Sequence, residues 1–207
     1  MSTIRRYPVT IAILTLVIVA ALLTATNTPA EHQALLNTIG MDLHALRHGH
    51  VFGIPLATFV QSSPGVEWHM LLLVALPLLA LELLAGSKRA LIAFLASDWL
   101  TAPITVLVLW ALSGMGSDSA NALLHQPDTG SSAAAHGALA CAIVLLPKRL
   151  TITCMTILVG ISLWALTFEI LGAAIAHLLG IGTGALIGLW FRAHPVQRCS
   201  ADMVICD

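Results

Sequence analysis

Apolar residues gather into six long runs, and these runs decide what the chain can fold into. They cover residues 9–26, 68–85, 90–112, 130–146, 150–166 and 172–191. A helix needs about 20 apolar residues to cross a bilayer, and most of the runs approach that length. The chain is only 9% charged, whereas soluble domains carry roughly 25% charged residues. We therefore expect an all-α polytopic membrane protein with six transmembrane helices in the lipid bilayer.

The N-terminal run is expected to remain in the protein as the first span. Arg5 and Arg6 precede it, a charge pattern that secretory signal peptides share. The run is about long enough to span a bilayer, and the "NTPA" after it is a weak cleavage site, so cleavage is the alternative. At the other end, residues 192–207 are predicted to form a short cytoplasmic tail. One membrane domain then covers residues 1–207.

Basic residues indicate which way the spans run. Of the nine Lys and Arg residues, only Arg47 falls outside the N-terminal segment, the loops after the second and fourth runs, and the C-terminal tail. Cytoplasmic loops carry an excess of Lys and Arg, so we expect cytoplasmic termini, an external 27–67 loop and a location in the cell membrane. The net charge of −1 supplies no field that would attract nucleic acid, and no such partner is expected.

Polar side chains within the runs are candidates for function, because hydrocarbon penalises a polar group that has no partner. They are His69, Glu82, Asp98, Ser132, His136, Ser162, Glu169 and His177. At about 1.5 Å per residue, Ser132 lies about 24 Å above the cytoplasmic end of its run, and His177 lies about 22 Å above the end of its own. A serine beside a histidine can act as a nucleophile with its general base. Taken singly, each would be interpreted as a packing or hydrogen-bonding residue.

Two of the other polar groups are expected to be structural. Glu82 lies near the cytoplasmic end of its run, and we expect it to pair with Lys88 or Arg89 by extending toward the interface. His136 lies one turn below Ser132 and is interpreted as a packed histidine, with a supporting role behind the Ser132–His177 pair as the alternative.

Small residues would allow the helices that carry Ser132 and His177 to approach closely. Gly172, Ala176, Gly180 and Gly184 follow one another at four-residue steps beside His177, and the other run offers Gly130, Ala134, Gly137 and Ala138. Stripes of this kind let membrane helices pack with their backbones in close contact. We therefore expect Ser132 and His177 to meet across this interface.

Three patches of the sequence resemble the rhomboid family of intramembrane serine proteases. The stretch "GSSAAAHG" (130–137) is similar to the family's Gly-x-Ser-Gly-x-x-x-Gly motif, and "GAAIAHLLG" (172–180) is similar to its Gly-x-x-x-Ala-His-x-x-Gly motif. "WHMLLL" (68–73), with the segment after it, resembles the family's second span. The resemblance runs from about residue 47 to residue 191, and it implies a six-span, rhomboid-like fold.

The resemblance also implies roles for individual residues. Ser132 would be the nucleophile and His177 the general base, while His69 would help to form the oxyanion hole and Gly130 would lie at the substrate site. Chemistry of this type needs no metal and no cofactor. The implied substrates are transmembrane segments of other membrane proteins.

Three departures from the family's pattern leave a second function open. Ala133 stands where the family has a glycine after the serine, and Leu73 stands where the family has an asparagine of the oxyanion hole. Arg47 is the nearest match to the family's Trp-Arg pair in the first loop. Losing one oxyanion donor can lower a rate about 100- to 1000-fold. The alternative is therefore a catalytically inactive rhomboid-like protein that binds transmembrane clients.

A small transporter or metal carrier is a third class of function. It would use His69, His136 and His177 as ligands or proton carriers. Such proteins usually show intramembrane carboxylate pairs and interrupted inverted repeats. The sequence shows neither pattern, so this class is the least favoured of the three.

Overall fold

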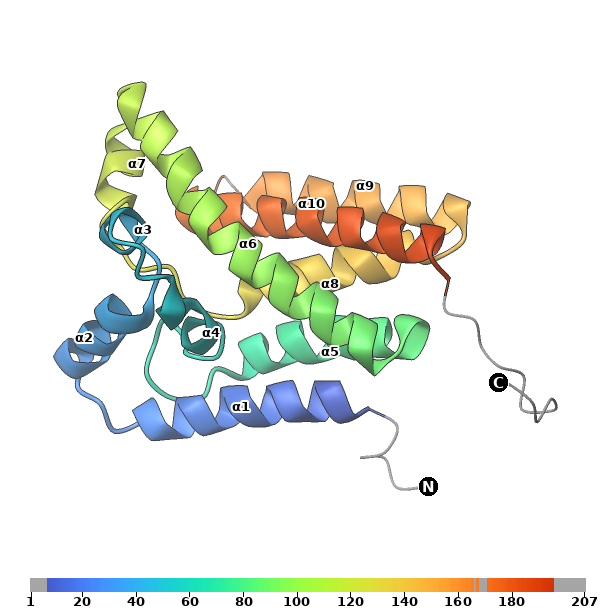
Figure 1. Cartoon of the computed structure of the whole chain (residues 1–207), viewed down its shortest axis with the longest axis horizontal. Coiled ribbons are helices and arrows are strands. Elements are labelled where there is room, and N and C mark those ends of the chain that lie inside the picture. Colours follow the sequence, from blue (N-terminus) through green and yellow to red (C-terminus); the bar gives the residue numbers. More distant parts are fainter. Residues whose placement is uncertain (1–6, 166, 168–170, 196–207) are drawn as a thin grey trace.

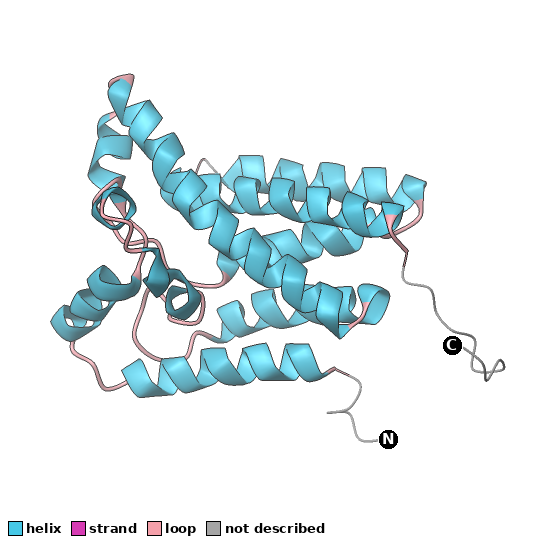
Figure 2. Ribbon diagram, in the orientation of Figure 1, coloured by secondary structure: helices cyan, strands magenta, loops and turns pink. Residues whose placement is uncertain are grey.

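The computed structural model describes residues 7–165, 167 and 171–195. This part of the chain is helical apart from its turns and one β-bridge between Met41 and Asp128, and it contains no strands (Figure 2). The helices are α1 (Pro8–Thr24), α2 (Pro29–Ile39), α3 (Leu43–Arg47), the short 3-10 helix η2 (Val51–Gly53), α4 (Ile54–Ala57), α5 (Trp68–Ala85), α6 (Ser87–Gly114), α7 (Asp118–Leu123), α8 (Ser132–Val144), α9 (Lys148–Ala165) and α10 (Leu171–Ala193).

Three of the described helices are long and apolar enough to cross a membrane, namely α5, α6 and α10. This finding indicates a membrane protein. Two further apolar helices are shorter, α1 with 17 residues and α8 with 13. The number of candidate spans in the described residues is therefore smaller than the six that the sequence predicted.

The predicted boundaries need correction at several points. The run 130–146 contains only the short helix α8, because Gly130 adopts a φ of +100° and the chain turns there before the helix begins. The run 90–112 lies inside the longer α6, which begins directly after α5. Residues 192 and 193 belong to α10 and not to a tail. The rest of the predicted tail beyond residue 195, together with Arg5 and Arg6, lies outside the described residues.

The axes of five helices, α1, α5, α8, α9 and α10, are roughly aligned, and α6 crosses them obliquely (Figure 1). The short helices α2, α3, α4 and α7 gather beyond one end of this bundle. Helix α8 lies at the centre, in contact with α5, α6, α9 and α10, and ten of its 13 residues are buried. Its N-terminus opens toward the gathered short helices.

Glycines bring α8 and α10 into backbone contact. A Cβ atom added at Gly184 would lie 1.9 Å from the carbonyl oxygen of Gly137, and one added at Gly180 would lie 2.5 Å from that of Ala133. No other residue type fits at these two positions unless the helices move apart. The expectation of facing small-residue stripes is confirmed here. Gly172 is an exception, because it faces side chains of α6 and α7.

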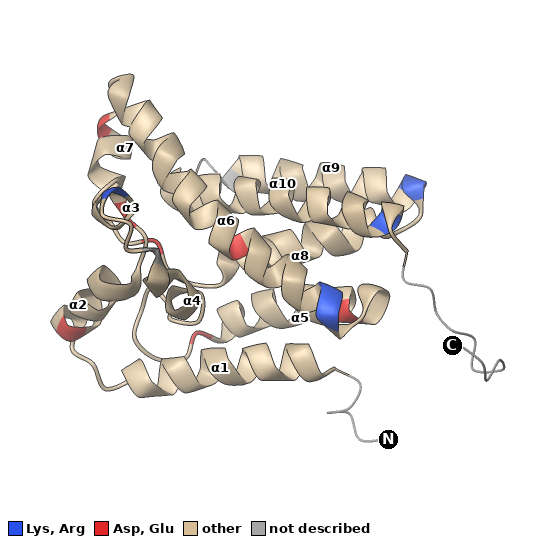
Figure 3. Ribbon diagram, in the orientation of Figure 1, with Lys and Arg blue, Asp and Glu red and all other residues tan. Residues whose placement is uncertain are grey.

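Basic residues gather at one end of the bundle (Figure 3). The described Lys and Arg residues other than Arg47 lie at the end where α5 meets α6, α8 meets α9 and α10 finishes. The predicted pairing of Glu82 with a basic residue at this end is wrong. Its carboxylate accepts hydrogen bonds from the Val9 N–H at 3.0 Å and from the N–H and hydroxyl of Thr10 at 2.8 and 2.6 Å. Glu82 therefore caps the N-terminus of α1, where the first backbone N–H groups have no partner within the helix.

Candidate active site

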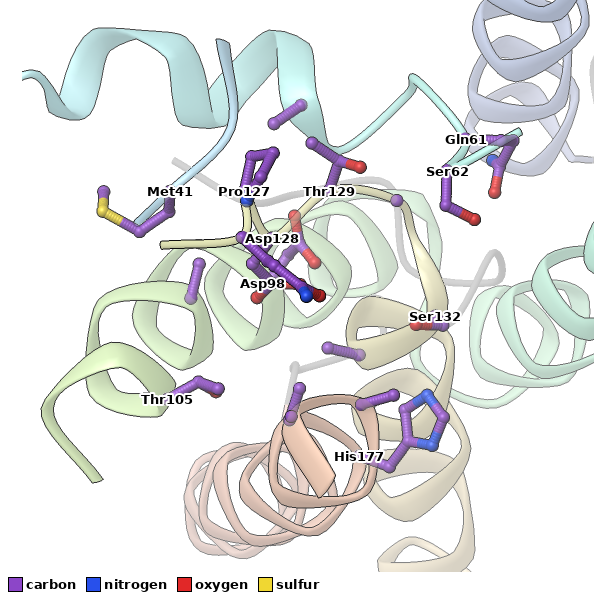
Figure 4. Close-up of a pocket in the computed structure, with 18 of the residues that line it drawn as sticks. Met41, Gln61, Ser62, Asp98, Thr105, Pro127, Asp128, Thr129, Ser132 and His177 are labelled. Carbon is purple, nitrogen blue, oxygen red and sulfur yellow. The ribbon is translucent and has the colours of Figure 1, made fainter. Parts of the chain in front are cut away.

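A cavity of about 790 Å³ lies where α5, α6, α8 and α10 meet the loops beyond the end of the bundle. All four of the site residues predicted from the sequence line it: Ser132, His177, His69 and Gly130. Figure 4 shows Ser132 and His177 on neighbouring helices at one side of this cavity. The wall also includes His136 and Leu73.

A turn places Ser132 at the start of α8. Gly130 takes a positive φ of 100°, a conformation that glycine adopts at little cost. Its N–H donates a hydrogen bond to the carbonyl of Ala57 at 2.9 Å, which ties the turn to α4. Ser132 is the first residue of the helix that follows, and its side chain is half-buried at the cavity. Gly130 thus shapes the turn that presents the serine.

The N-terminus of α8 supplies backbone donors beside the serine. The Ala135 N–H donates to the Ser131 carbonyl at 2.9 Å, and the Ala134 N–H is directed at the carboxyl of Asp98. The N–H groups of Ser132 and Ala133 meet no acceptor in the part of the chain that the structure describes. Free N–H groups and the positive end of the helix dipole favour a negative charge at this position. An oxyanion formed next to Ser132 would be stabilised there.

His136 contacts both members of the predicted pair. Its ring stacks on that of His177, with centroids 4.1 Å apart and an interplanar angle of 17°. Its Nδ1 lies 2.8 Å from the Ser132 carbonyl oxygen. A carbonyl only accepts, so Nδ1 carries the proton in this hydrogen bond. The sequence interpretation favoured a packed histidine and kept a supporting role as the alternative; the stacked ring fits both, and the position four residues after Ser132 places the two residues on one helix face.

His69 and Leu73 lie on the α5 side of the cavity. The His69 side chain is 76% exposed, and its Nε2 lies 3.4 Å from a carboxylate oxygen of Glu67. Leu73 follows one helical turn later and packs partly against the core of the bundle. Its side chain offers no hydrogen-bond donor, so His69 is the lining side chain of α5 that could donate to an oxyanion.

Two carboxyl groups also line the cavity, the buried Asp98 and the half-buried Asp128. The Thr58 hydroxyl donates to Asp98 at 2.6 Å, and it also accepts from the Trp99 indole N–H at 3.2 Å. Thr58 is therefore a hydrogen-bond partner of Asp98 from outside the bundle. Asp128 lies in the turn before α8, where its backbone pairs with that of Met41 at 2.9 and 3.1 Å. Burial raises the pKa of the Asp128 carboxyl to about 6. No pattern in the sequence marked Asp128 as a site residue.

Within the described residues, no three His, Cys, Asp or Glu side chains are arranged to hold a metal ion. The three histidines of the carrier interpretation are divided, because His136 and His177 stack on each other while His69 lies beside Glu67.

A comparison of this chain with protein-family models, curated proteins and solved structures finds no match.

Proposed function

We propose that the chain is an intramembrane serine peptidase of the rhomboid type that cleaves transmembrane segments of other membrane proteins. Ser132 is the nucleophile and His177 the general base. The observation that carries the proposal is that both residues line one cavity and that His136 contacts both, stacking on the His177 ring and donating to the Ser132 carbonyl. An ordinary packing interface would not need a cavity beside a serine at the start of a buried helix.

The proposed reaction is acyl transfer to the serine. His177 takes the proton of the Ser132 hydroxyl as the oxygen attacks a substrate carbonyl. The N–H groups of Ser132 and Ala133 stabilise the oxyanion that forms. The protonated His177 then gives its proton to the leaving amine, and water hydrolyses the acyl-enzyme. His136 positions the His177 ring by stacking on it.

The membrane arrangement is part of the same proposal. The six apolar runs form a six-span, rhomboid-like bundle in the cell membrane, and the basic end faces the cytoplasm with both termini. Helix α8 is too short to cross a bilayer of about 30 Å alone. It is surrounded by α5, α6, α9 and α10, so its N-terminus faces a polar cavity and not lipid. Backbone at membrane depth is tolerated where it lines such a cavity, which would also supply the water for hydrolysis.

Labelling with a fluorophosphonate probe tests the proposal. The wild-type protein in detergent or liposomes should form a covalent adduct, and Ser132→Ala and His177→Ala should each abolish it. The double variant should be no worse than either single change, because both residues serve the same step. Ser131→Ala is the matched control: Ser131 is its neighbour in sequence but is fully buried, so labelling should persist. Labelling that survives in Ser132→Ala would exclude this residue as the nucleophile.

The catalytically inactive client-binding protein is the second candidate, and one observation favours it. Leu73 lines the cavity where the family carries a donor, and no other donor side chain follows His69 along this wall of α5. The labelling experiment separates the two functions. A folded wild-type protein that retains a transmembrane peptide but never reacts with the probe would favour client binding over cleavage.

A further inference from the structure

The cavity carries a negative charge that the proposed reaction does not use. Its described lining includes the carboxyl groups of Glu67, Asp98 and Asp128, and it includes no Lys or Arg. Glu67 lies beside His69. Asp98 and Asp128 are near enough for the charge of Asp128 to act on Asp98, and Figure 4 shows both among the side chains that line the cavity. The proposed acyl transfer through Ser132 requires neither Asp98 nor Asp128.

The two carboxyl groups differ in how their oxygens are satisfied. Asp98 accepts from the Thr58 hydroxyl and faces the Ala134 N–H. The Asp128 carboxyl is half-buried on the cavity wall, and it accepts no hydrogen bond from any described residue. A carboxylate that is partly withdrawn from water and has no donor is stabilised by a cation or a proton. The Asp128 carboxylate can therefore accept a hydrogen bond from a group in the cavity.

One more polar side chain lines the same cavity without a partner. Thr105 is 2% exposed, and its hydroxyl has no hydrogen bond within the described part of the chain. Buried polar groups normally find partners. Asp128 and Thr105 therefore both offer the cavity an oxygen that no described residue satisfies.

We propose that the region around Asp98 and Asp128 is a subsite for a cationic side chain, Lys or Arg, of the substrate. This inference rests on the proposed peptidase function and names its substrate class: membrane proteins with a basic residue close to the cleaved bond. An ammonium or guanidinium group supplies only donors, which match the carboxylates and the Thr105 hydroxyl. The long apolar stem of Lys or Arg lets the charge reach inward from a segment lying near Ser132.

A peptide series tests the subsite with the full chain in liposomes. The probe is a synthetic Leu/Ala transmembrane peptide that carries Lys, Met or Glu in turn at each of the four positions on either side of the cleaved bond. At one position, Lys should raise kcat/KM at least about tenfold over Met, since pairing with a buried charge is worth a tenfold effect or more. Glu should be the poorest guest there. Equal rates for Lys and Met at every position would overturn the proposal.

Variants of Asp128 show whether this carboxyl causes the preference. Asp128→Asn should bring the ratio of Lys to Met rates close to one, and Asp128→Glu should retain most of it because the charge is kept. The ratio cancels any difference in the amount of active protein. Asp118→Asn is the control, because Asp118 is exposed on α7 and does not line the cavity. A Lys preference that is unchanged in Asp128→Asn would assign it to another site and refute the proposal.

A binding measurement keeps the subsite testable if the chain cuts nothing. Fluorescently labelled Lys and Met peptides are titrated onto the Ser132→Ala protein, and the Lys peptide should bind at least about tenfold more tightly, with the difference lost in Ser132→Ala/Asp128→Asn. If the wild-type protein cleaves nothing while this binding preference is present, the peptidase function is wrong and the subsite is supported. Equal binding of both peptides, with Ca²⁺ or Na⁺ binding that depends on Asp128, would mean that the cavity holds an inorganic cation and that the proposal is wrong.

Discussion

Gly184→Ala tests the close contact between α8 and α10 on which the candidate site depends. The added Cβ would lie 1.9 Å from the Gly137 carbonyl oxygen and 2.6 Å from its Cα. Both are backbone atoms, so no side chain can turn away to make room. The helices must separate by an ångström or more, on the order of the difference from an ordinary contact of about 3.5 Å. That movement would draw His177 away from Ser132.

Gly182→Ala supplies the matched control, because Gly182 lies two residues away on the same helix and an added Cβ there meets nothing within 4 Å. Replacing a mid-helix glycine by alanine at an open position stabilises a helix by about 0.5–1 kcal/mol. Overpacking a tight interface costs about 1–3 kcal/mol. Both substitutions share the gain in helix stability, so Gly184→Ala should be about 1–3 kcal/mol less stable than Gly182→Ala because of the overpacking alone.

Two measurements check this expectation in detergent micelles. Denaturant unfolding followed by tryptophan fluorescence gives the difference in free energy of unfolding between the two variants. The rate of fluorophosphonate labelling at Ser132 then shows whether the geometry of the site has changed in the folded fraction. Equal stability of the two variants would refute the close approach of α8 and α10. A destabilised Gly184→Ala that labels at the wild-type rate would show that the site does not depend on this contact.

Three further predictions follow from single contacts. Glu82→Gln should lower the free energy of unfolding by about 1–3 kcal/mol, because three donors of α1 lose a charged acceptor; urea unfolding measures it. His136→Ala should slow probe labelling about tenfold or more, whereas His136→Phe should retain much of the rate because it keeps a ring against His177. Burial raises the pKa of the Asp128 carboxyl from 3.8 to about 6, so folding favours its protonated form. The resulting stability is complete below about pH 4 and is lost as pH rises through 6, by up to about 3 kcal/mol; unfolding midpoints between pH 4 and 7 should show a flatter dependence in Asp128→Asn.

Local features of the sequence predicted much of the helical framework. Hydropathy alone placed the bounds of α5 and came within a few residues of α1 and α10, because each of these helices is a continuous apolar run. The spacing of glycines likewise predicted the contact of α8 with α10 at Gly180 and Gly184. Both signals depend only on residues that are close together in the chain.

Long-range contacts could not be predicted in this way. Glu82 caps α1 from 72 residues away, so the nearby Lys88 and Arg89 were the wrong partners to expect. Asp98 is satisfied by Thr58, which comes from the short helices beyond the bundle. Asp128 carries no signal at all in the sequence, since it lies in a polar turn and its burial comes from segments that are far apart in the chain.

The small apolar residues of α8 explain why a membrane span was predicted over residues 130–146. They also explain how a site can form at the start of this short helix. Its alanines and glycines are apolar enough to resemble a membrane span, yet they are small enough for six buried alanines and Gly137 to be enclosed by neighbouring helices. A helix enclosed by protein does not have to match the thickness of a bilayer. It can begin inside the bundle, and its first N–H groups then face a cavity where an oxyanion would be stabilised. A longer helix would extend Ser132 beyond the reach of His177, and a bulkier helix would hold α10 away from α8. The short, small-residue sequence of α8 is therefore what sets the position of the proposed nucleophile.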